Sequence, residues 1–253
     1  MSGWSRARVQ LCGRLAVEVD GDRIEERLPG RRGRVLFAYL VLHRGRPVPR
    51  DELLMAGWGA EAPAAAGNAL SVTLSKLRHG LGADRLQGRA EVELLLSPAA
   101  LVDVEAALEG ARRAETCIAE GRWAAAWGPA GIAYHVATRR FLLGLEAAWI
   151  DEWRRRLEEV RVRGLECFAA AGLGLGGPAL AQAEQRARAL TELAPYRETG
   201  HRILMETLER RGNLAEALRA YERLRVLLRD ELGTAPGPAL QDVHRRLLRR
   251  ADS

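Results

Sequence analysis

One amphipathic stretch, residues 68–81, constrains the fold of this chain more than any other part of its sequence. Leucines recur along it at the spacing of a single helix face, at Leu70, Leu74, Leu77 and Leu81. The other side carries small, polar or basic side chains, namely Val72, Thr73, Lys76 and His79, with Arg78 at the flank. The stretch contains no carboxylate, and a helix of this kind suits the DNA major groove. The alternative is an ordinary amphipathic surface helix.

The charge balance favours a polyanionic partner. The 253 residues include 39 lysines and arginines against 33 acidic residues, which gives a formal net charge of +6. Lys76 is the only lysine, so the excess of arginine also reflects the codon usage of a GC-rich genome. The length suggests one large domain or two ordinary ones.

Cysteine usage and hydropathy indicate an intracellular protein. Cys12, Cys117 and Cys167 are far apart and odd in number, so neither a disulfide framework nor metal-ligand spacing is visible. We expect reduced thiols in a cytoplasm. There is no apolar run of membrane-spanning length, and residues 1–8 lack the apolar segment of a signal peptide. We therefore expect a cytoplasmic, nucleoid-associated protein without membrane, metal or cofactor.

Residues 1–100 predict a small sheet, three helices and a hairpin, in that order. Strand-like runs cover Val9–Cys12, Leu15–Val19 and, after a turn, Arg23–Leu28. Helices are expected at 31–43, from Arg50 after the extended Pro47-Val48-Pro49, and at 64–81 after a loop at 57–63. Residues 85–86 and 91–96 predict a hairpin around Gly88 and Arg89. This order predicts an α+β winged helix-turn-helix domain, with the hairpin as the wing.

Residues 101–253 predict helices alone. Helical periodicity covers 103–120, 122–138, 145–171, 178–193, 196–211, 214–232 and 238–250. Long helices separated by short turns are typical of a helical-repeat solenoid. Gly212–Ala217 with Tyr221 resembles the turn and second helix of a tetratricopeptide unit. We therefore expect an all-α tetratricopeptide-like domain in this half.

Both halves resemble one protein family. Residues 9–100 resemble the OmpR-type winged-helix domain of the Streptomyces antibiotic regulatory protein (SARP) family, through Leu36–Leu40, Val48, Asp51–Leu53, Trp58-Gly59 and Asn68–Arg78. The second half resembles the bacterial transcriptional activator domain of that family, through Phe141–Leu145, Trp149, Glu152–Leu157, Leu193–Glu198, Tyr221–Arg225, Leu232-Gly233 and Pro236–Leu240. Since no ATPase or sensor segment is visible, the resemblance implies a small regulator made of these two domains.

The resemblance implies a transcriptional activator that binds promoter direct repeats as a homodimer and recruits RNA polymerase holoenzyme, including its sigma factor. The resemblance implies that its target genes are those of secondary metabolism in an actinomycete, and a related role in ordinary metabolism fits equally well. The DNA-binding residues expected on this ground are Asn68, Ser71, Val72, Thr73, Lys76, Arg78 and His79, with Arg50 and Arg89. The loop between the second and third helices faces polymerase in this family, which implies contacts from Trp58, Gly59 and Glu61.

Several of these residues have a structural alternative. Val72 suits a thymine methyl group, and its alternative is packing on the neighbouring helix. Lys76 and Arg78 suit guanine O6 and N7, and the alternative for Arg78 is a phosphate. Thr73 suits a phosphate. Arg50 suits a phosphate because helix N-termini favour anions, and its alternative is a solvated arginine. The alternative for Trp58 is a core position.

The predicted wing departs from the family pattern of a glycine pair followed by an aromatic residue and an arginine. It reads Arg89-Ala90-Glu91-Val92-Glu93, and strand alternation places both glutamates on one face and Val92 toward the core. Carboxylates beside a phosphate backbone are unfavourable unless they point away. The wing therefore supports a second hypothesis, a helical-repeat adaptor whose degenerate winged helix binds protein rather than specific DNA.

Other patterns carry no chemistry. Residues 172–177 match G-x-G-x-x-G, but they follow a predicted helix rather than a strand, so we expect an inter-helix loop. Arg154-Arg155-Arg156 is followed by Glu158 and Glu159, which predicts a solvated helix face with partial contact to phosphate or to a partner. The histidines are scattered, with no metalloprotease or serine-nucleophile motif. We expect no catalytic residue and no enzyme.

Overall fold

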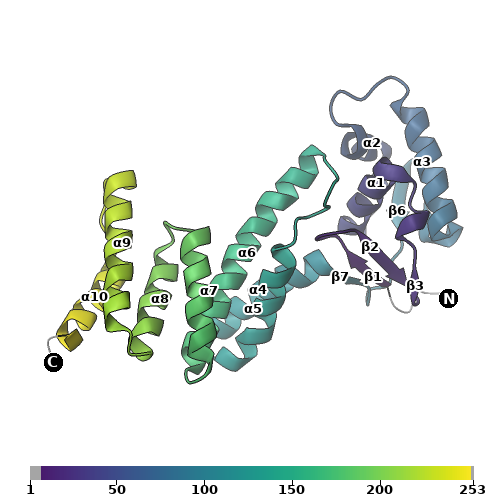
Figure 1. The fold of residues 1–253 in the computed structure, drawn as a ribbon. Helices are drawn as coiled ribbons and strands as arrows, with labels where there is room; N and C mark the ends of the chain where they lie inside the picture. Colours follow the sequence, from purple (N-terminus) through teal and green to yellow (C-terminus); the bar gives the residue numbers. More distant parts are fainter. Residues whose placement is uncertain (1–6, 252–253) are drawn as a thin grey trace. The chain divides into compact units, whose positions relative to one another are not determined.

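The computed structural model describes residues 7–251, a mostly helical chain with small sheets near its start (Figure 1). The chain divides into two compact units. The first comprises residues up to Ala106 together with Arg139–Leu157, and the second comprises Ala107–Thr138 and the residues from Glu158 onward. Residues 139–157, which the sequence assigns to the helical half, thus pack with the first unit.

The first unit begins with a sheet of strand order β3-β2-β1-β7. Its strands are β1 (Ala7–Gln10), β2 (Ala16–Val19), β3 (Asp22–Arg23) and β7 (Leu101–Val102). β2 pairs antiparallel with β1 and β3, while β7 pairs parallel with β1. β7 corrects the prediction that no strand follows the hairpin, since a two-residue strand carries too little alternation to be recognised.

The expected strand over Arg23–Leu28 is wrong beyond Arg23. Glu25–Arg27 instead form a 3-10 turn, η1. The Glu25 carboxylate accepts a hydrogen bond from the backbone N–H of Val17 at 3.3 Å and pairs with Arg23 at 2.6 Å. These two contacts fold the chain back on the sheet, so η1 replaces further strand pairing.

Helices α1 (Gly30–Leu42), α2 (Arg50–Trp58) and α3 (Ala66–Leu81) follow, with a sheet of strand order β4-β6-β5. The strands are β4 (Val48–Pro49), β5 (Leu86–Gln87) and β6 (Glu91–Leu94), and a second 3-10 turn, η2 (Ala83–Arg85), precedes β5. The predicted leucine face of α3 is confirmed, because all four leucines are at most 2% exposed. α2 extends through Gly57 and Trp58, which we expected in a loop, and ends where Gly59 takes a φ of +77°.

Residues 139–147 form an irregular segment rather than the expected helix start at 145. Phe141 bridges to Cys12 beside β1, and Trp149, in α6 (Ala148–Leu175), donates its indole N–H to the carbonyl of Ala56 at 3.0 Å. The Trp149 ring also packs edge-on against Tyr39, with centroids 5.1 Å apart. These contacts attach the segment to the first sheet and the start of α6 to α1 and α2.

The predicted solvated arginine face is confirmed at Arg155 and Arg156, which are exposed, and is wrong at Arg154, whose side chain is only 15% exposed. The Arg154 guanidinium donates to the carbonyls of Phe141 and Leu145 and pairs with Asp151 at 2.7 Å. The irregular segment leaves these carbonyls without helical N–H partners, and the arginine supplies the missing donors.

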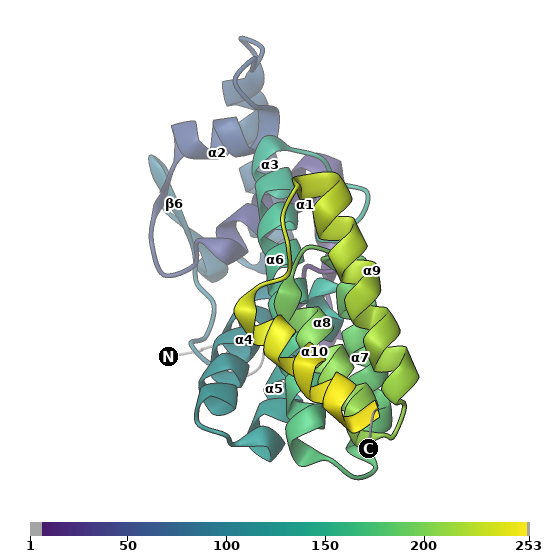
Figure 2. The ribbon, with the colours of Figure 1, turned by 90° about the vertical axis from the view of Figure 1, so that its left-hand side faces the viewer.

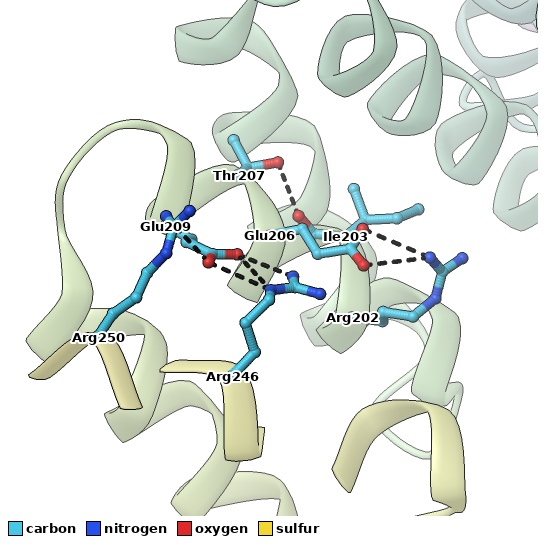
Figure 3. A network of polar contacts seen from close by, with 7 residues as sticks. All are labelled: Arg202, Ile203, Glu206, Thr207, Glu209, Arg246 and Arg250. Atoms are coloured by element: carbon cyan, nitrogen blue, oxygen red, sulfur yellow. Dashed lines mark hydrogen bonds and ion pairs between the residues drawn. The ribbon is translucent and has the colours of Figure 1, made fainter. Parts of the chain in front are cut away.

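The second unit is built from α4 (Asp103–Ala119) from residue 107, α5 (Trp123–Ala137), α6 from residue 158, α7 (Ala179–Leu193), α8 (Glu198–Arg210), α9 (Leu214–Leu232) and α10 (Pro238–Ala251). α8 packs against α7 and α9, and α10 contacts both α8 and α9 (Figure 2). The apolar core between these helices includes Leu204, Leu208 and Leu224. The carboxylate of Glu209 on α8 joins Arg246 and Arg250 of α10 (Figure 3).

The expected loop over the glycine-rich residues 172–177 is wrong at 172–175, because α6 continues to Leu175, and it is confirmed at Gly176 and Gly177, which lie between α6 and α7. Gly174 lies against the ring of Trp123, and a Cβ there would come within 2.2 Å of the indole. Gly172 similarly faces Ala183 of α7. The glycines therefore provide room for close helix packing instead of ending the helix.

Candidate nucleic-acid interface

The side of α3 opposite its leucines is open to solvent. Asn68, Ser71, Val72, Lys76 and His79 are exposed there, and Val72 reaches 54% exposure. Thr73 is half-buried and donates its hydroxyl to the carbonyl of Ala69 at 2.8 Å. At its exposure of 54%, Val72 is not packed on a neighbouring helix, and its side chain is accessible for an apolar contact outside the unit.

Arg50 fastens the start of α2 to the start of α3. Its Nη2 donates to the hydroxyl of Ser71 at 2.7 Å and lies 3.5 Å from the carbonyl of Gly67. The Arg50 backbone N–H donates to the carbonyl of Ala90 at 3.2 Å. Arg50 is half-buried rather than a freely solvated arginine.

Arg78 fastens the other end of α3 to the β5–β6 hairpin. Its Nε donates to the carbonyl of Leu86 at 3.1 Å, and its Nη2 donates to the carbonyl of Gly88. Gly88 has a φ of +86°, and a Cβ there would lie 2.0 Å from the carbonyl oxygen of Glu91. The hairpin tip thus requires glycine. Arg78 holds the hairpin through two donated hydrogen bonds, one to β5 and one to the tip.

The hairpin has the alternation that the sequence predicts. Val92 is fully buried, Glu91 is exposed and Glu93 is half-buried on the opposite side. Arg89 is exposed at the tip. The surface of the hairpin therefore offers one arginine beside two carboxylates.

A basic hollow of about 760 Å³ lies beside α3, lined by Arg27, Pro29, Ser75, Lys76, His79 and Gly80. None of these lining residues is acidic. Sequence reasoning selected Lys76 and His79 but missed Arg27, because Arg27 lies on η1 and no periodicity relates it to α3. The local sequence carries no signal for it either, because Arg27 directly follows Glu25 and Glu26.

The C-terminal end of α2 borders a second hollow of about 700 Å³, whose walls both belong to the first unit. Met55, Trp58 and Gly59 line one wall, and Trp149 and Arg155 line the other. Met55 is 57% exposed. Trp58 is half-buried, and the guanidinium carbon of Arg32 lies 4.8 Å from the centroid of its ring. Trp58 is therefore neither a core residue nor fully solvent-exposed. Glu61 is exposed in the following loop.

The three cysteine thiols are buried. Cys12, Cys117 and Cys167 are free thiols inside the protein, and burial raises the pKa of Cys167 to about 12. Across residues 7–251, no group of three or more His, Cys, Asp or Glu side chains is arranged to hold a metal ion. Over the same residues, no helix is both long and apolar enough to cross a membrane.

Comparisons with known proteins agree on one group of relatives. The model of the bacterial transcriptional activator domain matches residues 102–248. Regulatory protein DnrI of Streptomyces peucetius is 32% identical over 264 residues, covering 96% of this chain and 92% of DnrI. Regulatory protein AfsR of Streptomyces coelicolor is 34% identical over 95% of this chain, and AfsR of Streptomyces griseus is 32% identical over 85% of it. The chain spans only 24% and 22% of these two AfsR proteins.

A solved structure shares the fold. It is Mycobacterium tuberculosis EmbR in complex with a low-affinity phosphopeptide, with a TM-score of 0.83 and 26% sequence identity, covering 97% of this chain and 65% of that one. EmbR is described as a transcriptional regulatory protein. The relatives named here are all described as regulatory proteins.

Proposed function

This chain belongs to the SARP family of transcriptional activators, and from that premise we propose that it binds specific DNA at promoters through α3. We interpret α1–α3 and the β5–β6 hairpin as a winged helix-turn-helix, and the helices from α4 onward as a tetratricopeptide-like domain. The observation that carries the proposal is the outer face of α3, which is exposed and free of carboxylates while its leucines are buried. An α-helix with such a face fits the major groove.

Within this proposal, Val72 and Lys76 read bases, since they lie one helical turn apart on the exposed face. Lys76 donates to guanine and Val72 contacts a thymine methyl group, each good base contact contributing roughly 1–3 kcal/mol of discrimination. Asn68, Ser71 and His79 are at the edges of the face and contact bases or phosphates. Thr73, whose hydroxyl is partly engaged by Ala69, is assigned a phosphate.

Arg50 and Arg78 have a double role in this proposal. Each uses part of its guanidinium to hold one end of α3, and each presents its outer edge to a phosphate. Arg89 at the hairpin tip adds a contact beside the groove, with Glu91 turned away from the phosphates. The hairpin then acts as the wing.

The loop after α2 is the surface that we assign to RNA polymerase holoenzyme, including its sigma factor. Trp58 and Gly59 line the adjoining hollow, and Glu61 is exposed beside it. We propose a homodimer on direct repeats, acting at the nucleoid in the cytoplasm on genes of secondary metabolism. A DNA-bound variant that fails to activate would separate this surface from α3.

The test begins with purified protein and fragments of the host genome at near-physiological salt. We expect enrichment of one motif in two copies of the same orientation, with enrichment lost or relaxed in Lys76→Ala. In transcription with host RNA polymerase at the selected promoter, Trp58→Ala and Glu61→Ala should bind DNA normally and activate poorly. Absence of any enriched motif would refute sequence-specific binding.

The exposed Glu91 on the wing favours a second candidate, an adaptor whose winged helix binds protein. This candidate predicts DNA binding only at low salt and without sequence preference, because only the net positive charge would attract DNA. The same selection experiment distinguishes the two candidates.

A further inference from the structure

The basic hollow beside α3 contains an arginine that the proposed reading helix does not supply. Arg27 comes from η1, before α1, and its side chain is exposed at the hollow that Lys76 and His79 line from α3. Within residues 7–251, its guanidinium makes no hydrogen bond or ion pair. Other arginines of this unit, such as Arg23 and Arg44, are paired with carboxylates.

The backbone of Arg27 is fixed against α3 by Gly80. A Cβ built at Gly80 would lie 2.6 Å from the carbonyl oxygen of Arg27 and 3.4 Å from its Cβ. Only glycine permits this approach without a shift of η1 or α3. On either side of η1, Ile24 and Leu28 are buried, with exposures of 2% and 3%. The position of Arg27 is therefore set by its backbone, although its side chain is free.

We propose that Arg27 binds a backbone phosphate of the operator duplex, seated in the hollow beside α3. This inference rests on the proposed function, which places α3 in the major groove. The hollow adjoins the exposed face of α3 through Lys76 and His79, so DNA on that face brings its phosphate ridge to the hollow. A guanidinium suits a phosphate because its planar donors match two phosphate oxygens.

A contact between the Arg27 guanidinium and a phosphate should not depend on the base sequence of the DNA. Phosphate contacts position a protein on the duplex, and bases in the groove supply the specificity. Arg27 should therefore contribute to affinity and to salt dependence equally on operator and unrelated DNA. It would extend the interface from the helix-turn-helix to the turn that precedes it.

The test is the salt dependence of operator binding by the full chain. The slope of log affinity plotted against log salt concentration becomes more negative by about 0.9 for each phosphate contacted. We expect Arg27→Gln to reduce this slope by about 0.9 and to leave the enriched motif unchanged, while Arg27→Lys keeps most of the slope. Arg8→Gln is the matched control, because Arg8 is an exposed arginine at a separate hollow on the first sheet.

Gly80→Ala tests the placement without removing charge. The methyl group would displace the Arg27 carbonyl, so we expect weaker operator binding together with a lower midpoint of a thermal transition that stays cooperative. Binding equal to that of the wild type would contradict the placement.

The outcomes separate this inference from the proposed function. If the wild type discriminates its operator and Arg27→Gln has the wild-type salt slope, the phosphate contact is overturned while the function stands. If the wild type shows no operator preference, the proposed function fails and this inference fails with it. Inorganic phosphate could stabilise the wild type against unfolding and fail to stabilise Arg27→Gln, while the two proteins have equal salt slopes on DNA. That result would identify a site for a free anion and contradict the proposal.

Discussion

The guanidinium of Arg78 donates its Nε–H to the carbonyl oxygen of Leu86 at 3.1 Å, and this bond joins α3 to the first strand of the hairpin. A second donation from Arg78 reaches the tip carbonyl of Gly88. A charged donor on the flank of the proposed reading helix therefore also sets the position of the proposed wing. Loss of binding in an Arg78 variant alone would not demonstrate a base contact.

Arg78→Ala should release the hairpin as well as weaken DNA binding. Hydrogen bonds to a charged group contribute roughly 1.5–3 kcal/mol, so we expect faster hydrogen exchange at Leu86, Gln87 and Glu91–Leu94 in free protein. The measurement is amide exchange of the wild type and the variant without DNA. Unchanged exchange in the hairpin would mean that Arg78 has no positioning role.

Asp103 should be a major determinant of the stability of the first unit. Its carboxylate accepts the backbone N–H groups of Leu11 at 2.8 Å and Cys12 at 3.0 Å, and burial raises its pKa. Asp103→Ala leaves both donors unpaired, and we expect a loss of roughly 1–3 kcal/mol for each in urea unfolding. The exposed Asp242→Ala, which removes only a surface pair with Arg245, should change stability little. Equal effects of the two variants would contradict this assignment.

His201 should make the second unit less stable in mild acid. Burial lowers its pKa from the usual 6.5, and its Nε2 lies 2.9 Å from the carbonyl of Pro195. Because the unfolded chain then takes up the proton at a higher pH than the folded chain, the unfolding free energy is full above pH 6.5 and falls as the pH drops below it. Urea unfolding across this range should show the fall, and His201→Gln should reduce it.

The pKa of His244 is shifted in the same direction as that of His201, so a His244→Gln variant is compared with His201→Gln in the same unfolding experiment. The His244 ring stacks on Tyr221 with centroids 3.8 Å apart, and burial lowers its pKa as well. The single variants should each remove part of the acid sensitivity, and the double variant should remove more. A pH dependence that survives in the double variant would assign it to other groups.

A pair of glycine substitutions tests the packing of α6. Gly174→Ala places a methyl group on the Trp123 ring, so we expect a loss of roughly 1–3 kcal/mol despite the better helix propensity of alanine. A methyl group added at Gly67, inside α3, would meet nothing within 4 Å, and the control Gly67→Ala should stabilise by roughly 0.5–1 kcal/mol. Denaturant unfolding measures both changes. Stabilisation by Gly174→Ala would contradict a continuous α6 at this contact.

Periodicity predicted the parts of the fold that local burial decides. The leucine face of α3 and the burial of Val92 follow from the spacing of apolar residues, and both are confirmed. Gly212 and Gly233 end helices as their sequence context indicates. Each of these features depends on how one helix or hairpin faces the apolar core beside it, and the local sequence pattern records which side that is.

Features decided by partners distant in sequence could not be predicted. Arg154 is half-buried because carbonyls of the irregular segment before α6 need donors, and the local sequence shows only an arginine run. Gly174 lies within a helix because Trp123 needs its space. Arg27 reaches α3 because Gly80 allows a close approach. In each case the determining residue lies outside the local pattern.

The central claim, that α3 reads bases, is tested most directly by the operator preference of Lys76→Ala. The measurement is the ratio of affinities for the selected operator and a scrambled duplex, at one salt concentration, for wild type, Lys76→Ala and the exposed control Arg14→Gln. We predict that Lys76→Ala reduces this ratio by roughly 5- to 150-fold, as expected for a lost base contact of roughly 1–3 kcal/mol, while Arg14→Gln keeps it. A ratio unchanged in Lys76→Ala, or a wild type without preference, would contradict base reading by α3.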